Sequence, residues 1–221
     1  MITPFDETYL ETKRILLGQA SLKPEFAPLA GWIDTTFGVR TLNIVYDTIE
    51  PGKRPRLEIC FEFETAKAAF RDPVTALYDR EKQKAIAEKF KESIREQNLS
   101  ELYLTEGVWV IFGAFEPVAK IEAFNNLPEQ QVAELNRSLG NPDLWEISRY
   151  NGTVTFFLYT DRQVKQYEPS ATKKQWADRY FDLVKPHDTF GYLSRDAFDI
   201  CLDSKENFDK NYSSNWYYYY K

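Results

Sequence analysis

The sequence predicts an α+β fold with mainly antiparallel sheets, formed by two β-hairpins and a C-terminal strand that pack against several helices. Two observations predict this class. Apolar residues recur at helical spacing in some segments and alternate in others, and the two kinds of segment are intermixed without regular alternation. The chain of 221 residues is 43% apolar and 28% charged, which is enough for a core and unlike disordered protein. We therefore expect residues 1–221 to form a single compact domain.

Six segments carry the apolar spacing or the boundary residues of helices. Proline near the first turn and glycine or proline after the last turn mark their ends. In the longest segment, Ile86, Phe90 and Ile94 recur every fourth residue among lysine, arginine and glutamate. The predicted helices are residues 4–17, a short stretch after Pro24, residues 75–97, short stretches after Pro117 and Pro128, and residues 170–184.

Alternating apolar residues predict two hairpins. In the first, residues 40–50 alternate and the turn PGKRP leads into the strand RLEICFEF. In the second, Asn151 and Gly152 join two apolar-rich strands, and this dipeptide favours a tight type I′ turn. Residues 101–115 indicate one or two further strands. The terminal run SSNWYYYYK is aromatic on both faces of a strand, so we predict that it pairs beside residues 197–203.

Two distant segments resemble each other. LEICFEF (57–63) and FDICLDS (198–204) both alternate apolar residues with acid, cysteine and acid. A hairpin followed by a helix is also predicted in both halves, about 1–115 and 116–221, which is what a duplication would produce. The alternative is that amphipathic strands share this pattern by chance, and we favour that interpretation.

Charge and cysteine content limit the compartment and the partners. A formal net charge of −6 repels nucleic-acid phosphates and favours a basic partner. Residues 1–20 lack the apolar core of a signal peptide, and no window resembles a membrane span. Cys60 and Cys201 are too few for a disulfide framework. The sequence therefore predicts a cytoplasmic protein with no membrane partner, no nucleic-acid partner and no cofactor.

Catalytic motifs are sparse. His187 is the only histidine, and the glycine-rich phosphate-binding and GxSxG motifs do not occur. Asp47 and Glu58 on the first hairpin are the best catalytic candidates, because paired carboxylates can share a cation. Their arrangement resembles the Asp, then Glu-x-Lys pattern of restriction-type nucleases, but Cys60 stands where the lysine should be. One alternative is thus a metal-dependent hydrolase or nuclease using Asp47 and Glu58; the competing interpretation is a solvated sheet face.

The sequence favours a binding protein over an enzyme. Aromatic residues make up 16% of an acidic chain, and tyrosine and tryptophan anchor interfaces while carboxylates steer association. We therefore expect a non-catalytic protein-binding module, such as an inhibitor or immunity-type protein that acts on a basic partner through an acidic, aromatic surface. A protein that holds a small apolar ligand among its aromatics is a second alternative. The candidate partner-binding residues are Trp216, Tyr217, Tyr219, Glu58 and Glu62.

Overall fold

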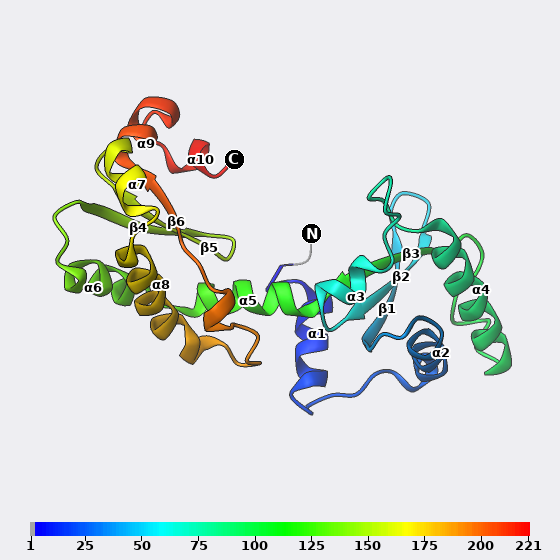
Figure 1. Ribbon diagram of the computed structural model, residues 1–221. Helices are drawn as coiled ribbons and strands as arrows, with labels where there is room; N and C mark the ends of the chain where they lie inside the picture. The colour runs from blue at the N-terminus through cyan, green and yellow to red at the C-terminus, as the bar shows by residue number, and fades with distance from the viewer. Residues whose placement is uncertain (1–2) are drawn as a thin grey trace. The chain divides into compact units, whose positions relative to one another are not determined.

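The computed structural model describes residues 3–221 and confirms the α+β class (Figure 1). The chain divides into two compact units, unit 1 up to Val118 and unit 2 from Ala119 onward. Each unit contains a three-stranded sheet with one antiparallel and one parallel strand pair, so the predicted antiparallel pairing is only part of the topology. Within residues 3–221, no helix has the length and apolar character needed to cross a membrane.

Unit 1 contains the first predicted hairpin and a third strand added to it. Strand β2 is central, antiparallel to β1 and parallel to β3. The elements are α1 (Glu7–Leu16), the 3-10 turn Pro24–Phe26, α2 (Ala27–Phe37), β1 (Thr41–Ile49), β2 (Arg54–Phe61), α3 (Glu64–Ala68), α4 (Arg80–Glu96), β3 (Trp109–Ala114) and α5 (Phe115–Asn126), which continues into unit 2.

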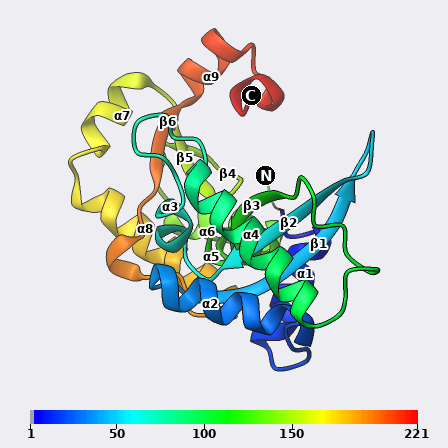
Figure 2. The same cartoon turned by 90° about the vertical axis from the view of Figure 1, so that its right-hand side faces the viewer.

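Helices α2 and α4 cover one face of this sheet, and α1 covers the other (Figures 1 and 2). The first face holds the core of the unit, where the predicted stripe of α4 meets fully buried residues of β2 such as Ile59 and Phe61. The second face is more polar. There the Thr12 hydroxyl of α1 accepts a hydrogen bond from the Asn43 amide of β1, at 3.3 Å, and both side chains are buried.

Helix α4 begins five residues later than the sequence pattern predicts. The side chain of Asp79 accepts hydrogen bonds from the backbone N–H groups of Glu81 and Lys82 and caps the helix at that point. The residues before it form a loop in which the Asp72 carboxylate accepts from the backbone N–H groups of Val74 and Thr75. The Asp79 cap and the Asp72 turn therefore set a boundary that apolar spacing alone does not mark.

Unit 2 contains the second predicted hairpin, again with a third strand parallel to its second strand. Asn151 and Gly152 have φ angles of 50° and 79°, which confirms the predicted tight turn. The elements are α6 (Glu129–Leu139), β4 (Leu144–Tyr150), β5 (Thr153–Leu158), α7 (Asp161–Tyr167), α8 (Ala171–Val184), two 3-10 turns (Lys185–His187 and Arg195–Ala197), β6 (Cys201–Ser204), α9 (Lys205–Tyr212) and α10 (Trp216–Tyr219).

The core of unit 2 lies between its sheet and helices α6 and α8. Helix α8 buries one apolar stripe, formed by Trp176, Ala177, Tyr180, Phe181 and Val184. Trp176 stacks on Phe156 of the central strand β5, and Tyr180 meets the same ring edge-on. The parallel pairing of β5 and β6 requires a long connection, which includes α7, α8 and residues 185–200.

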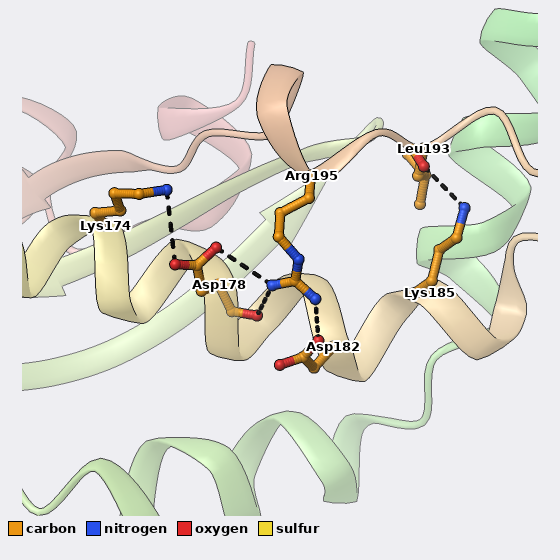
Figure 3. Close-up of polar contacts among 6 residues, drawn as sticks. All are labelled: Lys174, Asp178, Asp182, Lys185, Leu193 and Arg195. Carbon is orange, nitrogen blue, oxygen red and sulfur yellow. Dashed lines mark hydrogen bonds and ion pairs between the residues drawn. The ribbon is translucent and has the colours of Figure 1, made fainter.

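A charged cluster fastens the last part of that connection to α8 (Figure 3). The guanidinium of Arg195 donates to the carboxylates of Asp178 and Asp182 and lies 4.5 Å from the centre of the Phe181 ring. Lys185 donates to the backbone oxygen of Leu193 at 2.8 Å. The cluster therefore holds the chain against the helix before it turns into β6.

From α2 in unit 1 and from α6 in unit 2, the chain repeats one order of elements: a helix, a hairpin, two helices, a third strand parallel to the second, and a helix. Helix α1 precedes the first copy of this order, and α10 follows the second. Details of the pairing recur as well. Each hairpin has a register shift at the start of its first strand, and the helix before each hairpin, α2 or α6, ends at a left-handed glycine, Gly38 or Gly140. The similar segments LEICFEF and FDICLDS occupy different places, since 57–61 lie in a central strand and 201–204 in an edge strand.

Candidate functional site

The C-terminal aromatic run packs on the face of the unit 2 sheet that lies opposite helices α6 and α8. Phe157 of β5 points to this face, and its ring centre lies 5.2 Å from those of Trp216 and Tyr219. Phe208 of α9 lies 4.2 Å from Trp216 by the same measure. We call this group the C-terminal aromatic cluster; its members are Trp145, Tyr150, Phe157, Phe208, Trp216, Tyr219 and Tyr220.

The predicted C-terminal strand is wrong: residues Trp216–Tyr219 form the short helix α10. Ser213 and Ser214 adopt left-handed φ angles that end α9, and the Asn215 side chain accepts a hydrogen bond from the Tyr217 N–H at 2.9 Å. The helical turn places Trp216 and Tyr219 on the side that meets the sheet, whereas a strand would have separated them onto opposite faces.

Two tyrosine hydroxyl groups fix the end of the chain on the sheet. Tyr219 donates to the Asp203 carboxylate at 2.7 Å, and Tyr220 donates to the Ser148 hydroxyl at 2.6 Å. Burial, followed by the neighbouring Asp203 carboxylate, raises the pKa of Tyr219, and burial also raises the pKa of Tyr220. Tyr219 therefore packs within the cluster and bonds to the sheet, while its predicted contact with a partner stays a prediction.

Other aromatic rings of this region face outward. The exposed fractions are 67% for Tyr217, 55% for Tyr218 and 37% for Trp216, and Tyr150 is 55% exposed while it stacks on Tyr220. Trp216 thus has two roles, since one part of its ring packs in the cluster and the rest is accessible. The centre of the Tyr217 ring lies 5.7 Å from the Lys221 ammonium and 5.7 Å from the centre of the Tyr218 ring.

A small cavity of about 250 Å³ opens beside Trp216. We call it the tryptophan pocket. The indole rings of Trp145 and Trp216 are nearly parallel, with centres 6.1 Å apart. Within the described residues the carboxylate of Glu146 has no ion-pair or hydrogen-bond partner. The lining residues are Glu129, Trp145, Glu146, Ile147, Ser148, Arg149 and Trp216.

Sequence reasoning missed Trp145 and Glu146, although they adjoin in the predicted strand LWEISRY. Strict alternation assigns neighbouring residues to opposite sheet faces. The register shift between Leu144 and Glu146 breaks that alternation, which lets both side chains line one pocket. No sequence feature marks the bulge.

The carboxylates predicted on the first hairpin lie on the polar face of the unit 1 sheet, beneath α1. Asp47 pairs in register with Arg56, whose Nε donates to Oδ1 at 2.8 Å and whose Nη2 donates to Oδ2. Glu58 pairs in register with Val45 and is only 7% exposed. The structure therefore gives Asp47 an arginine partner, while Glu58, which lines the same cavity, forms no ion pair within residues 3–221.

Two neighbouring residues separate this face from the nuclease pattern. Cys60, at the position of the missing lysine, is a buried free thiol, and burial raises its pKa to about 12. Glu62 lies beyond the end of β2 and forms an ion pair with Arg40 at 2.6 Å. Among residues 3–221, no group of three or more histidine, cysteine, aspartate and glutamate side chains is arranged to hold a metal ion.

Glu58 makes the stability of unit 1 depend on pH. Burial raises its pKa, while a hydrogen bond from Thr8 and the charge of Arg56 act in the opposite direction. A raised pKa means that folding favours the protonated acid. The stability contributed by that proton is complete below the unfolded pKa of about 4.3 and is lost as pH rises through the higher folded value.

We therefore expect Glu58→Gln, which resembles the protonated acid, to raise the melting temperature by a few degrees at pH 7 and to have little effect near pH 3.5. Each unit of pKa increase corresponds to about 1.4 kcal/mol. Thermal melts of the unchanged protein and of Glu58→Gln between pH 3.5 and pH 7 test the sign of this change in melting temperature. Glu101→Gln, an exposed acid, serves as the matched control. A lower melting temperature for Glu58→Gln at pH 7 would show that the ionised form stabilises the fold.

Two candidate sites thus emerge, one in each unit, and they differ in character. The tryptophan pocket combines exposed aromatic rings with an unpaired carboxylate. The face beneath α1 combines a buried acid with paired and unpaired charges. Scans of this chain against protein-family models, curated proteins and solved structures find no match.

Proposed function

We propose that the protein is a non-catalytic binding module that recognises a basic protein partner through the tryptophan pocket and the exposed tyrosines around it. The observation that carries the proposal is the pair of parallel indole rings beside the unpaired carboxylate of Glu146. An arginine or lysine side chain of the partner stacks on the accessible ring of Trp216 and pairs with Glu146. This combination of π-face and carboxylate is specific for a cation.

The cluster already accommodates one cation from its own chain. The Lys205 ammonium lies 5.2 Å from the centre of the Trp145 ring. A pocket of about 250 Å³ suits a single side chain better than a whole ligand, which typically occupies 300–1,000 Å³. The size and lining of the pocket therefore favour a side chain presented by a protein.

The surroundings of the pocket suit a protein interface. Tyr150, Tyr217 and Tyr218 offer rigid aromatic area with a polar end, and such residues anchor many interfaces. The net charge of −6 steers a basic partner toward the protein at long range. An inhibitor or immunity-type role is the specific form of this proposal, in which bound partner is held inactive.

The proposal is tested with the full chain and a fluorescent arginine-rich peptide, followed by fluorescence anisotropy. We expect Glu146→Gln to weaken binding several-fold and Trp216→Ala to weaken it about tenfold or more, since interface tryptophans commonly contribute over 1.4 kcal/mol. Asp196→Asn, an exposed acid of the same unit outside the pocket, is the charge-matched control.

Because Trp216 also packs in the cluster, folding of each variant is checked by circular dichroism. Glu146 is exposed, so its substitution tests the pocket without disturbing the core. The proposal fails if Glu146→Gln and Asp196→Asn weaken binding equally, or if an acidic peptide of the same length binds as well as the basic one.

A further inference from the structure

A larger cavity of about 620 Å³ lies in unit 1 between α1 and the polar face of the sheet. Its wall is formed by one side of α1, including Thr8, Glu11 and Arg14, and its floor by side chains of β1, β2 and β3. The volume is in the usual range for pockets that bind small molecules. The tryptophan pocket lies in unit 2 and shares no residue with this cavity.

Glu58 is the distinctive group on the cavity floor. It is 93% buried and lies among the apolar side chains of Val45 and Ile111, which also line the cavity. Its Oε2 accepts a hydrogen bond from the Thr8 hydroxyl at 3.2 Å. Its Oε1 has no hydrogen-bond partner within residues 3–221. Unlike the Thr41 and Tyr180 hydroxyl groups, this oxygen is not sealed from solvent, so it is open to a donor that enters the cavity.

The charges around the cavity favour a positively charged donor. The Arg56 guanidinium is bound to Asp47, and these two charges largely cancel. The other charged groups that line the cavity are the acids Asp6, Glu7, Glu11 and Glu58 and the cations Arg14 and Lys23. Four carboxylates against two cations leave an excess of negative charge beside Glu58.

We propose that this cavity binds a small organic cation, an alkylguanidinium or alkylammonium group. Its N–H groups donate to Oε1 of Glu58, and its alkyl part lies against Val45 and Ile111. A guanidinium or ammonium ion donates to the accessible Oε1 and also offsets the excess of negative charge, whereas a neutral amide does only the first. The cation belongs to a free small molecule or to a basic side chain of a protein.

The test uses the full chain with butylguanidinium as the probe and butylurea as its neutral isostere. Binding is followed by NMR through the methyl groups of Val45 and Ile111. We expect butylguanidinium to shift both signals in a saturable way, and Glu58→Gln to lower its affinity at least tenfold. Glu101→Gln is the matched control and should bind like the unchanged protein.

The proposal is overturned if butylurea binds as tightly as butylguanidinium or if Glu58→Gln retains the affinity. Glu146→Gln should leave the binding of butylguanidinium in the cavity intact. Glu58→Gln should leave the binding of the arginine-rich peptide at the tryptophan pocket intact. The two proposals can therefore fail separately. Tighter binding of free arginine amide than of arginine within a peptide would support a free small molecule as ligand. The opposite order would support a partner's side chain.

Discussion

Removal of residues 213–221 is expected to destabilise unit 2 by about 3 kcal/mol or more. The deletion takes away Trp216, which packs against Phe157 and Phe208, and the hydrogen bonds that Tyr219 and Tyr220 make to the sheet. These three aromatic side chains are partly exposed, but each ring contact and each hydrogen bond commonly contributes about 0.5–1.5 kcal/mol, and the deletion removes several of them together. The exposed face of Phe157 and Phe208 should also make the shortened protein prone to aggregation.

Thermal melting and hydrogen exchange of strands β4–β6 measure this effect. The matched control is the double variant Tyr217→Ala, Tyr218→Ala, because both rings are largely exposed and the change should be within about 0.5 kcal/mol for each. If the shortened chain melts like the full chain, α10 contributes only a recognition surface and its packing on the sheet is unimportant for stability.

The elements that depend on local signals were predictable from the sequence. The Asn151-Gly152 turn fixes the second hairpin, and the four-residue spacing of apolar side chains fixes α4 and α8. The short helix α7 was missed although its signal is present. Thr160 and Gln163 form a capping box, and this pair at a spacing of three marks a helix start.

Parallel strand pairs were not predictable in this way. β3 joins β2 across the whole of α3 and α4, and β6 joins β5 across α7, α8 and a further connection. The residues that pair are far apart in the sequence, and no turn sets their register.

The strand predicted for the C-terminal run was wrong for another reason. The run is aromatic at every position, so it shows neither the two-residue period of a strand nor the 3.6-residue period of a helix. The cap formed by Asn215 favours the helix.

The candidate sites show the same division between local and long-range information. Alternation correctly placed Asp47 and Glu58 on one hairpin, but the register brings Arg56, and not Glu58, opposite Asp47. Trp216 was identified from its aromatic neighbours, whereas the pocket beside it depends on Glu146 from a strand some seventy residues earlier. Residue types therefore suggested the chemistry, while the fold determined which groups meet.

The second large expected effect is the loss of stability when one core residue is shortened in each of the two repeated units. Ile59 and Phe156 occupy matching places on the central strands, since Ile59 pairs with Phe112 of β3 and Phe156 pairs with Leu202 of β6. Both are fully buried, and each belongs to a different core cluster. We expect Ile59→Ala to cost about 2–5 kcal/mol and Phe156→Ala about 3–5 kcal/mol, because each leaves a cavity in a close-packed core.

Hydrogen exchange read strand by strand measures where each loss falls. Ile59→Ala should reduce protection mainly in β1–β3, and Phe156→Ala mainly in β4–β6, because a cavity weakens first the cooperative unit that contains it. The controls Leu102→Ala and Tyr159→Ala change exposed side chains of the same two units and should alter protection little. If either core variant reduces protection equally in both sheets, the two clusters unfold as one cooperative core, as the expected single domain over residues 1–221 requires.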